Sequence, residues 1–292
     1  MCKATKNPID NKIPIVVLVN SNSASASEVF SGAMQDLDRA VIVGERTYGK
    51  GLVQTTRPLP FGGNLKVTIS KYYIPSGRCV QAINYAERNE DGSVKRIPDS
   101  LTTEFKTRNG RIVRDGGGIL PDVKVEHKNM STICYNLYKE NIIFNYVVEY
   151  ISKHSKIENP KIFQYNDYDE FKEYVKKQQF SYKLKTEECI NSLKEIAKAE
   201  GYLDYSKDEF DALEKKLSHN LEQDLTLFKD EICNLISLEI MKQVYYQKGA
   251  IIQSLKYDKV KDEAIQILKD KERYSSLLQP QKEEDNKSQE KK

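Results

Sequence analysis

The sequence predicts an α/β domain followed by an α-helical domain. In the first part, continuous apolar runs at 15–19 and 40–43 are typical of strands that are covered on both faces. Beyond about residue 130, glycine becomes rare, lysine and glutamate dominate, and apolar residues recur every three or four positions. We therefore expect an α/β domain over 1–126 and a helical domain over 127–278. The polar, charged tail at 279–292 is expected to be disordered.

The elements of the first domain follow one another with short connections. The run at 15–19 predicts a buried strand, the pattern near 26–37 a helix, and the run at 40–43 a second strand. Segments rich in β-branched residues around 52–56 and 65–73 predict two further strands. A sheet of buried strands needs neighbours, and the first strand begins almost at the start of the sequence. We therefore expect that part of this domain lies upstream.

In the second domain, one run of apolar residues has clear helical spacing. Its members step by three or four residues, which places them on one face of a helix packed against other helices. They are Leu213, Leu217, Leu221, Leu225, Phe228, Ile232 and Leu235.

The overall composition excludes several classes of function. Of the 292 residues, 46 are basic and 43 acidic, so the net charge of +3 does not produce the basic field that nucleic-acid binding needs. The longest apolar run, 13–19, is far shorter than the ~20 residues of a membrane-spanning helix. The N-terminal residues contain no signal peptide. The five cysteines are scattered, with no Cys-x-x-Cys pair, so neither a zinc site nor a disulfide framework is expected.

A cluster of small residues follows the first strand and leads into the predicted helix. Within it, Ser25-Ala26-Ser27-Glu28 fits a capping box, in which a serine hydroxyl and a glutamate carboxylate satisfy free N–H groups at the helix start. A serine nucleophile would occupy the same kind of strand-to-helix turn, because the helix N-terminus presents N–H donors to a developing oxyanion. Both interpretations share one geometry.

A catalytic serine needs a base, and the α/β segment contains no histidine. The three histidines are His127, His154 and His219, so a Ser-His-Asp triad has no local candidate. A lysine can act as the base near neutral pH only when burial lowers its pKa by several units from ~10.4.

Lys50 is the lysine with the most unusual surroundings. It lies between Gly49 and Gly51, which allow the backbone to approach other groups closely. If 50–54 is extended, Lys50, Leu52 and Gln54 lie on one face, and Gln54 could orient the lysine.

The same region also matches part of a phosphate-binding loop. Residues 44–50 fit the G-x-x-x-x-G-K pattern. Gly51 stands where a serine or threonine should hold magnesium, however, and 52–58 is predicted to be a strand and not the required helix. Nucleotide binding is therefore not expected.

Several motifs, in order along the chain, together resemble the C-terminal processing peptidases, or tail-specific proteases. The resemblance covers roughly 14–126. Its motifs are Ser23-Ala24-Ser25-Ala26-Ser27-Glu28, Met34-Gln35-Asp36, Arg39-Ala40, Gly44, Thr47-Tyr48-Gly49-Lys50-Gly51 with Val53-Gln54, Tyr72-Tyr73-Ile74-Pro75-Ser76-Gly77-Arg78 and Gly118-Ile119-Leu120-Pro121-Asp122-Val123.

The resemblance implies a serine endopeptidase with a Ser-Lys dyad on a crotonase/Clp-protease-like α/β core. Ser25 would be the nucleophile, Lys50 the general base and Gln54 the residue that positions the lysine. The backbone N–H of Ala26 would be an oxyanion-hole donor, and neither a metal nor another cofactor is implied. Family members cut exported or unfolded proteins near their C-termini, so the substrates would be unfolded or C-terminally exposed polypeptides. The resemblance also implies a periplasmic or cell-envelope location.

The sequence departs from the family pattern in two places. The family's PDZ domain and the first half of its core, which supplies an oxyanion-hole glycine, normally precede the strand at 15–19. An insertion with a predicted turn at 89–92 also separates Gln81 from Gly116. The alternative is therefore a catalytically inactive fragment or scaffold that retains the peptidase fold. Neither the natural substrate nor the oligomeric state follows from the sequence.

Overall fold

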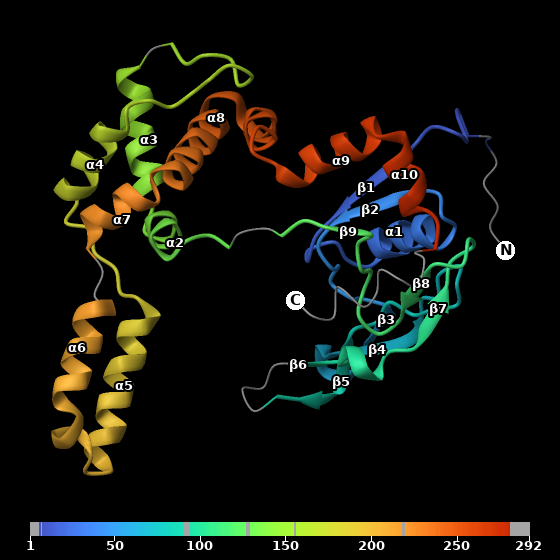
Figure 1. Cartoon of the computed structure of the whole chain (residues 1–292), viewed down its shortest axis with the longest axis horizontal. Coiled ribbons are helices and arrows are strands. Elements are labelled where there is room, and N and C mark those ends of the chain that lie inside the picture. Colours follow the sequence, from blue (N-terminus) through green and yellow to red (C-terminus); the bar gives the residue numbers. More distant parts are fainter. Residues whose placement is uncertain are drawn as a thin grey trace. The chain divides into compact units, whose positions relative to one another are not determined.

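The chain forms two compact units, which Figure 1 shows in a computed structural model. The structure describes residues 6, 8–89, 94–126, 129–154, 156–217 and 220–280. The sheet unit comprises Met1–His127 with Asp258–Lys292, and the helical unit comprises Lys128–Tyr257.

A parallel sheet forms the centre of the sheet unit. Its strands are β1 (Val16–Val19), β2 (Val41–Gly44) and β9 (Val123–Lys124), in the order β1-β2-β9. Helix α1 (Ala26–Asp36) connects β1 to β2. All four residues of β2 are buried, as the apolar run at 40–43 predicts.

Different elements cover the two faces of this sheet. On one face, Ile42 packs in a cluster that also contains Met34 of α1. On the other face, Val41 and Val43 pack with Ile267 of α9 (Lys259–Lys269). The prediction that the apolar runs form strands covered on both faces is confirmed for β2.

The last helices, α9 and α10 (Lys271–Leu277), belong to the sheet unit, whereas the sequence predicts a single helical domain over 127–278. The physical reason is that Ile267 is completely buried against β2. In addition, the Tyr274 hydroxyl accepts a hydrogen bond from the Ile15 N–H at 3.0 Å. Helical spacing alone does not reveal which partner a helix covers. Of the predicted tail at 279–292, residues 281–292 lie outside the described part of the chain.

Three antiparallel hairpins complete the sheet unit, together with the short 3-10 helices η1 (Pro60–Gly62) and η2 (Asp99–Leu101). The hairpins are β3 (Leu52–Pro58) with β4 (Asn64–Lys71), β5 (Ile83–Arg88) with β6 (Val94–Arg96), and β7 (Glu104–Lys106) with β8 (Ile112–Arg114). The predicted strands near 52–56 and 65–73 are therefore confirmed. The expected insertion forms the second and third hairpins, and residues 90–92 of its predicted turn lie outside the described residues.

The helical unit has an aromatic core. Its helices are α2 (Thr132–Lys139), α3 (Ile142–Lys153), α4 (Tyr168–Lys177), α5 (Lys185–Ala199), α6 (Lys207–Leu217), α7 (Leu221–Leu227) and α8 (Lys229–Ser254), with the short 3-10 helix η3 (Leu203–Ser206) after α5. Among the described residues, α5 and α6 contribute none to this core. Tyr146 and Phe171 are buried at its centre, with ring centroids 5.0 Å apart. No helix in the described ranges is long and apolar enough to cross a membrane.

The predicted helix face from Leu213 to Leu235 is wrong, because these residues are divided among three helices, α6, α7 and α8, and Phe228 lies between α7 and α8. The Asn220 side chain accepts hydrogen bonds from the N–H groups of Glu222 and Gln223, so it starts a new helix, α7. Regular spacing across a helix start is therefore not evidence for one continuous helix.

Candidate active site

Two loops meet at the carboxyl ends of β1 and β2, which are neighbouring parallel strands. A Cβ on Gly44 would lie 2.0 Å from the Val19 carbonyl oxygen, so only glycine allows this close approach. The Glu45 N–H donates to the same oxygen at 3.0 Å. The loop at 20–25 and the loop at 45–51 therefore start side by side.

Ser25 occupies a strained turn between the first loop and α1. Its φ is 57° and its ψ is −117°, the geometry of the first central position of a type II′ turn. The Ser27 N–H donates to the Ala24 carbonyl oxygen at 3.2 Å, which closes this turn. Ala26, the next residue, is the first of α1, so its N–H has no acceptor within the helix. A strained serine at a strand-to-helix turn is the arrangement of a nucleophile elbow.

The Ser25 hydroxyl is not used to cap α1. It makes no side-chain cap hydrogen bond, and the Glu28 N–H donates to the Ser25 carbonyl oxygen at 2.9 Å. The Ser25 hydroxyl instead lies 3.5 Å from the Tyr72 hydroxyl. Of the predicted capping box, the glutamate half is formed, since the Glu28 carboxylate accepts from the Ser25 N–H at 2.9 Å.

Glu28 connects the serine loop to the lysine loop. Its side chain is completely buried, and its carboxylate accepts four hydrogen bonds. Oε1 accepts from the Thr47 hydroxyl at 2.5 Å and from the Gly49 N–H at 2.7 Å. Oε2 accepts from the Lys50 N–H at 2.8 Å and from the Ser25 N–H at 2.9 Å. The sequence predicts only the capping half of this role, because the other half depends on a loop distant in sequence.

The two glycines beside Lys50 allow the close backbone approach that the sequence predicts. A Cβ on Gly49 would lie 2.2 Å from the Cβ of Ala82. The Gly51 N–H donates to the Gln81 side chain at 2.7 Å. The Lys50 backbone is therefore fixed on both sides, whereas its side chain is exposed.

The predicted site residues are brought together only in part. Ser25 and Lys50 share the Glu28 carboxylate through their backbones, but within the described ranges no hydrogen bond joins the Ser25 hydroxyl to the Lys50 ammonium. Gln54 lies in β3 and donates to the Thr68 hydroxyl across the strand pair at 3.4 Å. The burial that a lysine base requires is not present around Lys50 in this structure.

The motif at 118–123 holds the lysine loop from the opposite side. The Ile119 N–H donates to the Thr47 hydroxyl at 2.7 Å, and the Thr47 N–H donates to the Ile119 carbonyl oxygen at 3.1 Å. Thr47 therefore joins this motif to Glu28, which explains why both segments contribute to one site.

A buried ion pair fixes the other end of α1. Arg78 donates to the Asp36 carboxylate at 2.8 Å, and both side chains are almost completely buried. Arg78 also donates to the Gln35 side chain at 2.8 Å. Burial lowers the pKa of Arg78, and the neighbouring Asp36 carboxylate opposes this shift. The structure thus joins the motif at 34–36 to the motif at 72–78, a connection that the sequence does not reveal.

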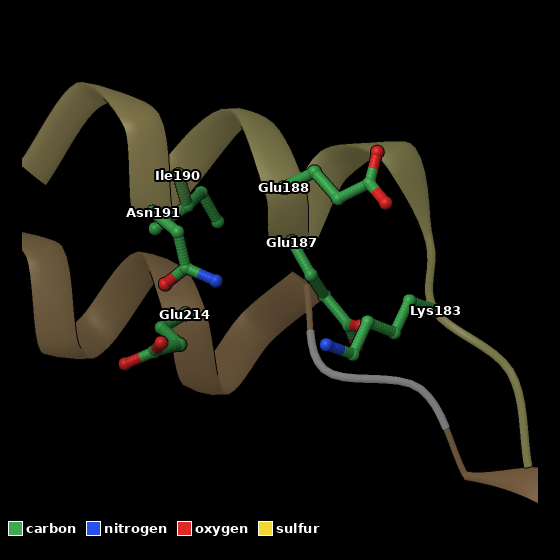
Figure 2. A pocket seen from close by; sticks show the side chains of 6 residues that line it. All are labelled: Lys183, Glu187, Glu188, Ile190, Asn191 and Glu214. Carbon is green, nitrogen blue, oxygen red and sulfur yellow. The ribbon is translucent and has the colours of Figure 1, made fainter.

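The remaining candidate features lie elsewhere. His154 lies in the helical unit, where its Nδ1 is 2.8 Å from the Tyr150 carbonyl oxygen, and His127 and His219 lie outside the described residues. Figure 2 shows a cavity between α5 and α6 that contains none of the predicted site residues. Its lining is formed by Lys183, Glu187, Glu188, Ile190, Asn191 and Glu214.

Two family models match separate parts of the chain. Residues 2–87 match the model described as "Peptidase family S41", and residues 133–268 match the model described as "Probable PDZ-protease, C-terminal helical domain". The first segment is therefore similar to a peptidase family, and the second is similar to the C-terminal helical domain of probable PDZ-proteases. The resemblance to C-terminal processing peptidases is confirmed.

Individual relatives of this chain are named as C-terminal processing enzymes. A chloroplastic C-terminal processing peptidase of Tetradesmus obliquus is 42% identical over 103 residues, which cover 35% of this chain and 21% of that protein. A carboxy-terminal-processing protease of Bartonella bacilliformis is 53% identical over 70 residues, which cover 24% of this chain and 16% of that protein. The chain thus spans about a fifth or less of the length of these curated relatives.

Among solved structures, a photosystem II D1 C-terminal processing protease is 33% identical to this chain. The match covers 44% of this chain and 24% of that protein, with a TM-score of 0.28.

Proposed function

We propose that the protein is a serine endopeptidase in which Ser25 is the nucleophile and Lys50 is the general base. The observation that carries this proposal is the buried Glu28 carboxylate, which accepts from the backbone N–H groups of both residues at 2.9 and 2.8 Å. This shared anchor fixes the two loops relative to each other. A second link supports it, since the Tyr48 N–H donates to the Ser23 carbonyl oxygen at 3.0 Å.

The reaction is an acyl transfer in two steps. Neutral Lys50 takes the proton of the Ser25 hydroxyl while the oxygen attacks the scissile carbonyl, and the Lys50 ammonium then protonates the leaving amine. In the second step water attacks the acyl-enzyme while Lys50 takes its proton. The bond to the Ser25 oxygen then breaks, Lys50 returns the proton to that oxygen, and the new C-terminus is released. The N–H of Ala26 donates to the oxyanion, and the positive end of the α1 dipole stabilises it.

This chemistry requires that Lys50 loses its water shell when the substrate is bound. The Lys50 side chain is exposed in the structure, so a polypeptide lying over it would remove that water shell, and desolvation disfavours the charged form of the amine. Gln54 then positions the ammonium. No metal or cofactor takes part in these steps. The substrates are unfolded or C-terminally exposed polypeptides, and the relatives' names favour cleavage near C-termini. The periplasmic or cell-envelope location rests on the family resemblance alone.

The test compares hydrolysis of an unstructured polypeptide by the natural full-length protein and by matched variants. Ser25→Ala and Lys50→Arg should each lower kcat/KM by at least about 10³-fold, because arginine keeps the charge but cannot be deprotonated. Ser27→Ala and Lys71→Arg, exposed residues of the same unit, should retain activity. Full activity of Ser25→Ala would refute the proposal. An inactive natural protein would favour the alternative of a scaffold that keeps the peptidase fold.

A further inference from the structure

Helices α5 and α6 form a hairpin that buries very little of its own surface. Lys194 of α5 contacts Glu214 of α6 at 2.8 Å and Asp211 at 3.6 Å, which fixes the two helices as an antiparallel pair. Across both helices, Ile190 is the only buried residue. Short helices are marginal in water without tertiary packing, so a hairpin with so little burial requires a further partner.

The apolar residues of the hairpin gather on one side of it. Each residue turns about 100° around a helix, so Leu193 and Ile196 flank the stripe of α5 that meets α6. Leu213 and Leu217 lie on the matching flank of α6, and in an antiparallel pair the two flanks point to the same side. These four side chains form the apolar face, and their exposed fractions are 50, 54, 42 and 39%.

The opposite side of the hairpin is polar. By the same 100° spacing, Glu187 and Asn191 lie on the other flank of the α5 stripe that meets α6. Both line the cavity that Figure 2 shows between the two helices, together with Lys183 and Glu214. The hairpin therefore has one polar side and one apolar side, which is typical of a helix pair that packs against another surface through a single side.

Exposed charges at the two ends of the apolar face have opposite signs. Lys185 begins α5 and Lys216 is close to the end of α6, so both lie at the base of the hairpin. Glu200 follows α5 and Glu209 is near the start of α6, so both lie at the tip. The apolar face is thus basic at the base and acidic at the tip.

We propose that the apolar face binds the same face of a second copy of this chain. A two-fold axis near Leu193 reverses the direction of the second hairpin, so the basic base of each copy lies against the acidic tip of the other. The leucines and Ile196 then form the core of a four-helix bundle, and the charges form its rim. A polypeptide or an anionic membrane has no reason to require opposite charges at the two ends.

The first test measures the oligomeric state of the 1–292 chain by sedimentation equilibrium over a concentration series. A dimer is expected for the wild type, and Leu193→Asp/Leu213→Asp should raise its dissociation constant by at least about 100-fold. The matched control, Asn191→Asp/Lys198→Gln, makes the same change in net charge away from the apolar face and should remain dimeric. Circular dichroism should show unchanged helix content for both variants.

A charge exchange tests the orientation of the two copies. Lys185→Glu/Lys216→Glu makes both ends acidic and Glu200→Lys/Glu209→Lys makes both ends basic, so each variant alone should dimerise at least about 10-fold more weakly. A one-to-one mixture of the two should form a heterodimer, with an affinity close to that of the wild-type dimer. A monomeric wild type, a dimer that survives Leu193→Asp/Leu213→Asp, or a mixture that does not associate would overturn the proposal.

Discussion

Ser25, the proposed nucleophile, has an unfavourable backbone conformation. At φ 57° and ψ −117°, it occupies a turn position that strongly prefers glycine. A side chain held in such a region costs on the order of 1–3 kcal/mol. We interpret the strain as the cost of presenting a hydroxyl at the start of α1.

This strain predicts that glycine at position 25 stabilises the protein relative to alanine, although neither residue has the hydroxyl needed for activity. Ser25→Gly removes the steric cost and should be more stable than Ser25→Ala by about 1 kcal/mol, after the larger chain entropy of unfolded glycine is subtracted. Both variants lack the hydroxyl and should be inactive. Urea unfolding of the two variants measures the difference. If the glycine variant is the less stable one, the turn is not strained.

The four hydrogen bonds of Glu28 predict that even the conservative substitution Glu28→Gln lowers stability and activity. In Glu28→Gln an NH₂ group replaces one oxygen, and each carboxylate oxygen accepts from two donors. Whichever way the amide is oriented, two donors then face a donor inside a buried site. We expect a loss of about 3 kcal/mol or more in the free energy of unfolding, together with a fall in kcat.

The control for this prediction is Glu104→Gln, which changes an exposed glutamate of the same unit. It should leave both unfolding and kcat almost unchanged. Equal stability of Glu28→Gln and Glu104→Gln would show that the Glu28 carboxylate does not hold the two loops together.

At the scale of elements, the sequence predicts helices and strands correctly where a short stretch of neighbouring residues determines the structure. The uninterrupted run at 40–43 gave β2, and the small residues before Glu28 gave the start of α1. The predictions are wrong where a contact between residues distant in sequence determines the structure. Nothing in the spacing around Ile267 distinguishes a helix on a sheet from a helix on other helices. The spacing also hides the new helix that starts after Asn220.

The same limit applies to the candidate site. Ser25 and Lys50 could be proposed from residue types and motif spacing, because a helix start and a glycine-flanked lysine are local features. The sequence does not reveal the role of Glu28 in the lysine loop or the partner of Arg78, because both depend on contacts between segments that are separate in the sequence.

Arg78 holds the C-terminal end of α1, so even the substitution Arg78→Lys should lower the stability of the protein strongly. Arg78→Lys keeps the charge but cannot reproduce the forked contacts to Asp36 and Gln35. Breaking a buried pair costs about 3–5 kcal/mol, so we expect Arg78→Lys to lose at least half of that. Arg57→Lys, an exposed arginine in the same unit, is the control. Equal midpoints of thermal unfolding would contradict this prediction.

For the whole molecule, the two units have separate hydrophobic cores, so they should lose stability separately. Ile267→Ala should destabilise the sheet unit by about 2–5 kcal/mol, and Phe171→Ala should destabilise the helical unit by about 3–5 kcal/mol. Hydrogen exchange resolved by peptide should show each effect confined to its own unit.

A thiol provides a second measurement of this independence. Cys134 is buried in the helical unit, and burial raises its pKa to about 12. It should react with a thiol reagent only when that unit opens. Faster labelling of Cys134 in Phe171→Ala, and unchanged labelling in Ile267→Ala, is the expected result. The reverse pattern would show that the units are not separate.

The sheet unit is discontinuous along the chain, and this sets the order in which a ribosome can complete the two units. The residues that cover the second face of β2 follow the whole of the helical unit, Lys128–Tyr257, in the sequence. At ~5–20 residues per second, those intervening residues take roughly 7–26 s to synthesise. During that interval the second face of β2 remains uncovered, whereas the helical unit can already fold. The sheet unit is therefore the later of the two units to be finished, although its strands are made before the helical unit.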